Sequence, residues 1–195
     1  RLNFQHNSLS ALFDDKLILA PVSFSKGDRI LDCGTGTGIW ATEVARDVPD
    51  VLVEGTDIST RFFPLPGEIS AVTFHNLSTF DLPPQWENRF NLINQRLMVM
   101  CFSRAQWEAA LQNIHRVLKP GGWVQLIEVK QKHGFSATHP RFQPLLNATQ
   151  TMMKERDFLI DPGVGLEEIL KESGFKEVIR TSKVAPIGEW GGDRG

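Results

Sequence analysis

The chain has 195 residues, of which 41% are hydrophobic and 23% are charged, and its formal net charge at pH 7 is -2. This composition is typical of a globular protein, and the length suits one domain with a sizeable core. The near-neutral charge and the absence of a run of Lys or Arg argue against nucleic acid as a partner. No apolar stretch approaches the roughly 20 residues that span a bilayer, and the N-terminus lacks a signal-peptide layout. We therefore expect a cytoplasmic protein that does not bind a membrane.

The two cysteines carry little chemistry in this sequence. Cys33 and Cys101 each follow a predicted strand, and neither has a CxxC or HxxH companion nearby. Free, small hydrophobic side chains therefore explain them better than a disulfide or a metal pair. We expect no metal site.

The N-terminal segment has the periodicity of an amphipathic helix that ends before Pro21. Its apolar residues are separated by polar ones: Leu9, Leu12, Phe13 and Leu17. We assign residues 1–24 to a helical cap beside the sheet. A polar cluster at Gln5, His6 and Asn7 either faces a ligand or is solvated, as polar clusters near a terminus usually are.

A glycine-rich turn follows a short apolar strand at residues 29–31. Its glycines alternate with other residues: Gly34, Gly36 and Gly38. Glycine lets the backbone reach positive φ and come close to a bound molecule, while the first N–H groups of the following helix point into the same crevice. The turn is therefore typical of a ligand-binding loop.

The spacing of this turn separates it from a dinucleotide fingerprint. That fingerprint reads G-x-G-x-x-G and places a pyrophosphate at a helix N-terminus. Here Ile39 stands at the position of the third glycine, and Asp32 precedes the turn. A carboxylate at this place would repel a pyrophosphate but can accept a cationic amino group. The turn therefore indicates a nucleoside that carries a positively charged tail.

A second acidic residue ends the next predicted strand. Asp57 follows a buried strand at residues 51–56 and lies about twenty residues beyond Gly38. At this offset in βαβ units, a carboxylate accepts hydrogen bonds from ribose hydroxyls. We predict that Asp57 binds a ribose; a turn or helix-capping aspartate is the alternative.

Two polar residues, Gln95 and Arg96, follow the strand predicted at residues 90–94. Ligands of doubly wound sheets gather at the carboxyl ends of strands, near the point where the strand order reverses. We therefore expect both side chains to overlook the pocket. Arg96 either holds a carboxylate of cofactor or substrate, or forms an exposed salt bridge.

The turn and the elements after it resemble the class I methyltransferases, which bind S-adenosylmethionine. The resemblance rests on the D-x-G-x-G-x-G pattern at residues 32–38 and on the LKPGG string at residues 118–122, which precedes a strand. Three stretches are similar to the fungal methyltransferases of the LaeA type: residues 19–21, 34–40 and 55–59. The resemblance implies an α/β fold with a doubly wound, mostly parallel Rossmann-like sheet, whose cofactor-binding core covers residues 25–130. The antiparallel seventh strand of the family is not visible in this sequence.

The resemblance also implies which residues bind the cofactor. The glycine turn would hold the methionyl part, and Trp40 would line the pocket unless it packs on its own helix face. Ser78 and Thr79 align with the residues that cover the adenine. With the acidic and polar residues above, the predicted cofactor-binding positions are Asp32, Gly34, Thr35, Gly36, Gly38, Trp40, Asp57, Ile58, Ser78, Thr79, Gln95 and Arg96.

The second half of the chain is predicted to hold the acceptor-side elements. A capping box at Ser103-x-x-Gln106 begins a helix that the LKPGG string stops. We then expect strand five at residues 123–129, a helix at 141–153, a helix starting at 161 and strand six at 175–184. Residues 131–195 form the acceptor-side part of the single domain 1–195.

We predict transfer of a methyl group from S-adenosylmethionine to an O, N or S atom of a small-molecule acceptor in secondary metabolism, leaving S-adenosylhomocysteine. The sulfonium already activates the methyl group, so a general base is needed only if the acceptor must lose a proton. Glu128, His133 and His139 are the candidate bases. The alternatives are a nicotinamide-dependent oxidoreductase and a regulatory protein that acts through protein partners, in the nucleus in that case. Homodimer formation stays open.

Overall fold

A computed structural model describes residues 1–65, 67–130, 141 and 143–185 of the chain. Five parallel strands form one sheet in the order β3-β2-β1-β4-β5. The strands are β1 (Arg29–Cys33), β2 (Leu52–Asp57), β3 (Val72–Asn76), β4 (Phe90–Arg96) and β5 (Leu118–Ile127). The strand order reverses between β1 and β4, so the carboxyl ends of these two strands mark the place where ligands of such sheets bind.

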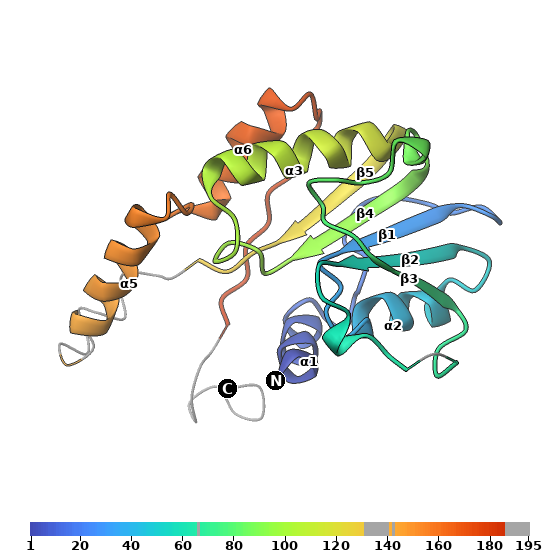
Figure 1. Cartoon of the computed structure of the whole chain (residues 1–195), viewed down its shortest axis with the longest axis horizontal. Helices are drawn as coiled ribbons and strands as arrows, with labels where there is room; N and C mark the ends of the chain where they lie inside the picture. The colour runs from blue at the N-terminus through green and yellow to red at the C-terminus, as the bar shows by residue number, and fades with distance from the viewer. Residues whose placement is uncertain (66, 131–140, 142, 186–195) are drawn as a thin grey trace.

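Helices cover both faces of the sheet (Figure 1). They are α1 (Leu2–Leu12), α2 (Ile39–Asp47), α3 (Arg104–Val117), α5 (Gln143–Glu155) and α6 (Pro162–Glu172), with short 3-10 helices at Thr60–Phe62 and Pro84–Trp86. One face carries α2, with α1 beside it, and the other carries α3 and α6, whereas α5 projects away from the sheet. This arrangement confirms the doubly wound α/β fold and the N-terminal helix. In the described part of the chain, no helix is long and apolar enough to cross a membrane.

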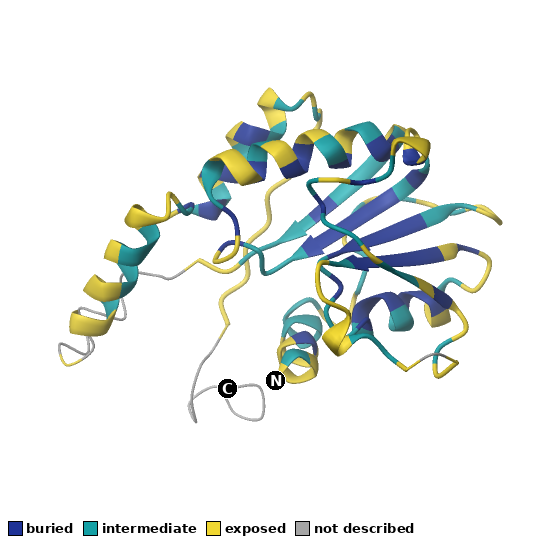
Figure 2. Cartoon of the chain, viewed as in Figure 1, coloured by how far each residue is buried: buried dark blue, intermediate teal, exposed yellow. Residues whose placement is uncertain are grey.

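Alternation along each strand sends side chains to two separate cores. Ile30 and Leu92 pack with α2 on one face, and Leu31 and Ile93 pack with α3 on the other. All four side chains are fully buried, and Figure 2 shows the central strands dark along most of their length. Because both faces are covered, consecutive residues in the middle of these strands are apolar: Ile30 and Leu31 in β1, and Leu92 and Ile93 in β4.

The capping box that begins α3 forms as predicted. The Ser103 Oγ accepts a hydrogen bond from the Gln106 backbone N–H at 3.3 Å, and the Gln106 side chain accepts one from the Ser103 N–H at 2.9 Å. Both bonds satisfy donors at the helix start. The two cysteines are free, Cys33 being buried and Cys101 exposed.

Two sequence predictions about element boundaries differ from the structure. The first helix ends at Leu12 instead of continuing toward Pro21, because Asp14 and Asp15 adopt a left-handed φ of 58°. Strand five begins at Leu118 rather than at residue 123, because the LKPGG string joins the sheet through a register shift against β4.

The prediction of strand six was wrong. Residues 175–184 carry no regular secondary structure, although their pattern reads as a strand. Ile179 is 69% exposed and Val184 is 66% exposed. A strand needs a hydrogen-bonded neighbour, and a local pattern of apolar residues does not reveal whether such a neighbour exists.

Candidate functional site

The glycine-rich turn joins β1 to α2 at the carboxyl edge of the sheet. Gly34, Gly36 and Gly38 adopt φ values of 68°, 57° and 72°, the left-handed region that only glycine enters freely. A Cβ on Gly38 would lie 2.5 Å from the Phe74 ring, and one on Gly34 would lie 3.2 Å from the sulfur of Met98. The turn therefore needs glycine both for its backbone and for the close approach of its neighbours.

Asp32 is buried at the end of β1, directly below the turn. Its carboxylate accepts hydrogen bonds from the Thr35 Oγ1 at 2.6 Å and from the Asn94 Nδ2 at 2.7 Å. Burial raises the pKa of Asp32, and the positive charge of Arg96 opposes this rise. A carboxylate has about four lone-pair sites, so Asp32 keeps acceptor capacity for a cationic group.

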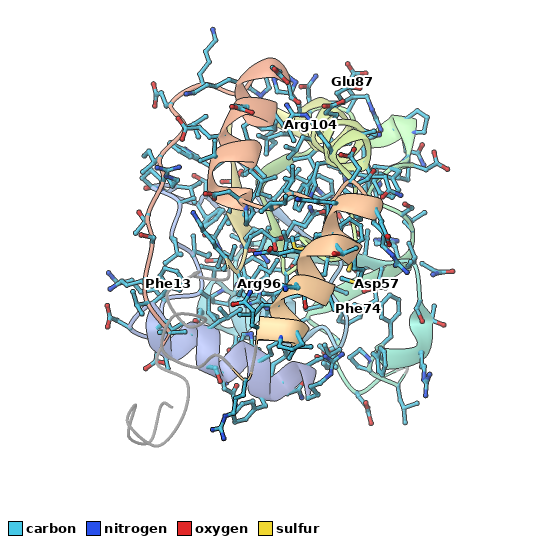
Figure 3. All side chains as sticks on the ribbon, turned by 90° about the vertical axis from the view of Figure 1, so that its left-hand side faces the viewer. Phe13, Asp57, Phe74, Glu87, Arg96 and Arg104 are labelled. Atoms are coloured by element: carbon cyan, nitrogen blue, oxygen red, sulfur yellow. The ribbon has the colours of Figure 1, made fainter. Side chains whose placement is uncertain are left out.

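Asp57 ends β2 and braces the glycine turn from the other side. One carboxylate oxygen accepts from the Gly36 N–H at 2.9 Å, and the other accepts from the Ser59 N–H at 3.0 Å. The next residue, Ile58, is 77% exposed. Figure 3 looks onto this edge of the sheet and shows Asp57, from β2, and Arg96, from β4, both at this end. The carboxylate is only partly buried and keeps lone pairs that a diol can use.

Arg96 links the end of β4 to two helices. Its guanidinium lies 5.9 Å from the centre of the Trp40 ring, and its Nη2 lies 3.2 Å from the Nδ1 of His6. A guanidinium only donates hydrogen bonds, so His6 must accept at Nδ1 and donate from Nε2 to Glu43, at 2.8 Å. Arg96 is therefore neither an exposed salt-bridge residue nor directed at solvent, and it ties α1, α2 and β4 together.

The N-terminal helix α1 lies over the glycine turn. A methyl carbon of Leu2 would lie 3.4 Å from a Cβ on Gly36, and the Thr37 hydroxyl donates to the Asn3 side chain at 2.7 Å. Of the polar cluster predicted near the N-terminus, His6 turns inward and is only 3% exposed. The helix therefore caps the turn, as its sequence position suggested.

Two predicted pocket residues are buried in the sheet and its cores instead. Trp40 is 1% exposed and donates from Nε1 to the Leu17 carbonyl at 3.1 Å, which matches the packing alternative. Gln95 is fully buried, and among the described residues neither of its amide atoms has a hydrogen-bond partner. Alternation along β4 sends Gln95 to the α3 face, together with Ile93, while Arg96 points to the α2 face. Gln95 is therefore not exposed in this structure, and its contact with a cofactor stays a prediction.

The segment after β3 holds the two residues that were assigned to the adenine. The Ser78 Oγ accepts a hydrogen bond from the Phe80 N–H at 3.2 Å, and Thr79 is 6% exposed. The Ser78 hydroxyl thus stabilises its own turn in this structure. The contacts of both residues with a cofactor stay predictions.

Glu128 lies just beyond β5 and holds the loop that follows β4. Its two carboxylate oxygens accept from the Met98 N–H at 2.7 Å and the Val99 N–H at 3.0 Å. Burial raises the pKa of Glu128 to about 7. The loop begins at Leu97, whose φ of 60° is unfavourable for a branched side chain, so these two bonds stabilise a strained turn. The other candidate bases, His133 and His139, lie outside the described residues.

Sequence reasoning missed two residues of the site, Asn94 and Gln125. Asn94 is fully buried and binds Asp32, and Gln125 binds Asn94 through its Nε2 at 3.0 Å. Both are buried polar residues inside parallel strands of the sheet, and a polar residue at a buried strand position is the signal that identifies such sites.

A cavity of about 320 Å³ lies between α1 and α2, apart from the glycine turn. Its lining residues are His6, Asn7, Ser10, Asp15, Leu17, Glu43, Arg46 and Asp47. Within the described residues, no cluster of His, Cys, Asp and Glu could hold a metal ion.

Comparison with known proteins adds relatives and solved structures to this geometry. A family model described as "Methyltransferase domain" matches residues 30–122. N-methyltransferase sirN of Leptosphaeria maculans is 37% identical over 99% of this chain and 68% of its own. N-methyltransferase gliN of Aspergillus fumigatus is 31% identical over 96% of this chain and 68% of its own. The secondary metabolism regulator laeA of Monascus pilosus is 30% identical over 97% of this chain, but over 52% of its own.

Solved structures share the fold at lower identity. The CurJ carbon methyltransferase has a TM-score of 0.61 at 18% identity, over 88% of this chain and 47% of its own. Phosphoethanolamine N-methyltransferase 2 of Haemonchus contortus, in complex with S-adenosyl-L-methionine, has a TM-score of 0.57 at 20% identity, over 90% of this chain and 37% of its own. Sequence relatives and fold thus agree with the glycine turn at the end of β1, and the chain belongs to the class I S-adenosylmethionine-dependent methyltransferases of the LaeA-like type.

Proposed function

We propose that this chain transfers a methyl group from S-adenosylmethionine to a nitrogen atom of a small-molecule acceptor in secondary metabolism and releases S-adenosylhomocysteine. The observation that carries the proposal is the 37% identity with an N-methyltransferase over 99% of this chain. A second N-methyltransferase supports it over 96% of this chain. Among the O, N and S acceptors considered from the sequence, these names favour nitrogen.

The residues around the glycine turn fit the cofactor of this family. Asp32 would accept the amino group, because it is buried, ionisable and keeps free lone pairs beside its bonds to Thr35 and Asn94. Asp57 would accept from the ribose hydroxyls, because its half-exposed carboxylate stands at the end of β2. The positive φ values of Gly34, Gly36 and Gly38 give the turn a backbone that can approach a ligand closely. The adenine contacts of Ser78 and Thr79 remain part of this proposal.

The cofactor, when bound, supplies a methyl group that its sulfonium already activates. The chain therefore has to position the two reactants in line and to exclude water. The loop after β4 contributes to this positioning, since Glu128 fixes the backbone of Met98 and the Met98 side chain lies against Gly34. Glu128 is also the described candidate for accepting a proton from an amine, because its pKa of about 7 is near neutral pH.

The test is to incubate the full chain with labelled S-adenosylmethionine and a panel of small amines, phenols and thiols. We expect transfer of the labelled methyl group to an amine at a rate above that in buffer without the protein. Label only in a phenol or a thiol would contradict the nitrogen assignment. A calorimetric titration that shows binding of NADH but not of S-adenosylmethionine would contradict the whole assignment.

A regulatory role is the second candidate, and the similarity to the regulator laeA favours it. That relative is matched over 52% of its length, against 68% for the two N-methyltransferases, so catalysis is the better supported function. Binding of the cofactor without methylation of any acceptor in the panel would support regulation. A nuclear site of action and protein partners belong to this second candidate, and a cytoplasmic location without nucleic-acid partners belongs to the first.

A further inference from the structure

Three polar side chains lie side by side across three neighbouring strands. Asp32 of β1 is in register with Asn94 of β4, and Asn94 is in register with Gln125 of β5. Their exposed fractions are 3%, 0% and 6%. Residues in register on adjacent parallel strands point to the same face, which here is the α2 face of Ile30 and Leu92. A polar row therefore crosses an otherwise apolar core.

The chemistry of Asp32 fixes the direction of every hydrogen bond in this row. An ionised carboxylate only accepts, so Asn94 must present its Nδ2 to Asp32, at 2.7 Å, and its Oδ1 to the other side. Gln125 must then present its Nε2 to Asn94, at 3.0 Å, which turns its Oε1 outward. One arrangement of the two amides satisfies all their partners.

The outward end of the row holds the segment that follows the cap helix. The Gln125 Oε1 accepts from the Leu19 N–H at 2.6 Å and from the Ala20 N–H at 3.3 Å. The Gln125 Nε2 also donates to the Leu17 carbonyl at 3.0 Å, and the Trp40 Nε1 donates to the same carbonyl at 3.1 Å. Residues 17–20 are not part of any strand, so side chains of the core take the place of a sheet partner.

We propose that Gln125 is a positioning residue, which couples the docking of residues 17–20 to the binding of a cationic amino group at Asp32. The proposal rests on the proposed function, in which Asp32 receives the amino group of the cofactor. A cation at Asp32 holds the carboxylate in its ionised, accept-only form, and hydrogen bonds in a buried chain polarise one another. Coupling between two sites is reciprocal, so a docked segment also favours the cation.

Amide hydrogen exchange on the full, unaltered chain tests the coupling directly. Saturating S-adenosylhomocysteine, which carries the same amino group, should slow exchange at the Leu19 and Ala20 amides. The comparator is the Gly27 amide, which donates to the Asp50 carbonyl near the amino ends of β1 and β2. Its exchange rate should not change. Binding of S-adenosylhomocysteine that leaves Leu19 and Ala20 unchanged would overturn the inference while the proposed function stands. Failure to bind it at all would overturn both.

Substitutions along the row give a second readout. Gln125→Leu should raise the Kd for S-adenosylhomocysteine about tenfold, because a broken buried chain weakens a charged hydrogen bond at Asp32, and should remove the protection at Leu19 and Ala20. Gln112→Leu, at an exposed position of α3, is the matched control and should leave the Kd unchanged. Asn94→Leu should act like Gln125→Leu, and the double variant should be no weaker than either single one. Additive losses would overturn the coupling, because they would mean that the two amides act independently.

Discussion

The region around the glycine turn and the helix α5 are built in opposite ways. The turn is enclosed by two cores, by the brace of Asp57 and by α1, and the strand before it is almost entirely buried. Helix α5 has no buried residue, and Leu145 on it is 64% exposed. Figures 1 and 2 show the contrast, with α5 extending away from the sheet and largely coloured as exposed or half-buried. The cofactor half of the site is therefore specified by the core itself, whereas α5 can change in sequence without disturbing that core.

This contrast predicts that a substitution in the turn has the largest effect on stability. Gly38→Ala should lower the free energy of unfolding by about 2–5 kcal/mol, because it adds a left-handed alanine and a clash with the Phe74 ring. Gly121→Ala is the matched control, since Gly121 has a similar φ of 77° but open space around its Cβ position. It should cost only about 1–2 kcal/mol. Urea denaturation measures both, and equal losses would mean that the Phe74 contact carries no energy.

The second-largest effect is expected at Asp57, which accepts a hydrogen bond from the Gly36 N–H of the turn. Asp57→Ala should weaken binding of S-adenosylmethionine by about 1.5–3 kcal/mol, because charged hydrogen bonds to buried hydroxyls contribute about that much. Calorimetric titration gives the affinity, with Asp47→Ala in α2 as a control outside the turn. An unchanged affinity for Asp57→Ala would remove the ribose assignment.

The third prediction uses the ionisation of Glu128. Its pKa rises from 4.5 to about 7 on folding, so the folded state binds this proton more tightly than the unfolded chain does. The stabilisation is full below about pH 4.5 and is lost as the pH rises through about 7. Glu128→Gln abolishes the titration and loses one accepted N–H bond. The free energy of unfolding of the variant, minus that of the unaltered chain, should therefore be at least about 1 kcal/mol higher at pH 8 than at pH 5.

Urea denaturation of both proteins at the two pH values checks this. A stability difference that is the same at pH 5 and pH 8 would mean that Glu128 ionises with an ordinary pKa. Protonation of Glu128 would then not stabilise the loop that follows β4.

The smallest effect belongs to α5. Leu145→Ala should change the free energy of unfolding by less than about 0.5 kcal/mol, because the side chain is mostly exposed. The affinity for S-adenosylhomocysteine should stay the same. A large loss in either quantity would show that α5 is coupled to the core and would remove the contrast between the two regions.

Local features of the site follow from the sequence, and features that depend on register do not. The glycine turn, the acidic strand ends at Asp32 and Asp57 and the capping box of α3 are read from residues close together in the chain. The row through Asn94 and Gln125 requires knowing which residues of β1, β4 and β5 face one another, and this depends on pairing between distant segments. The same holds for Gln95, because which face of the sheet it points to follows from its alternation with Asn94 and Arg96 along β4.

The wrong prediction of strand six has the same cause, because the local sequence does not show which segments pair. Residues 175–184 hold several residues that favour a strand, such as Val178, Ile179 and Val184, but in the described part of the chain the sheet ends at β5. Trp40 was left between a pocket wall and a packing position because helical spacing places it on a face without saying what covers that face. The segment at residues 17–20, which packs there and accepts its indole N–H, could not be located from the sequence.

The two thiols differ in exposure, so that one of them can be labelled selectively. Burial raises the pKa of Cys33 to about 12, so this thiol stays protonated and inert toward alkylating reagents. Cys101 is exposed in the loop that Glu128 holds, and partial desolvation of its sulfur together with the charges of Glu128 and Asp57 raises its pKa as well. A maleimide fluorophore at mildly alkaline pH should therefore attach to Cys101 alone. Such a dye would sit beside the two carboxylates and could follow ligand arrival without any engineered residue.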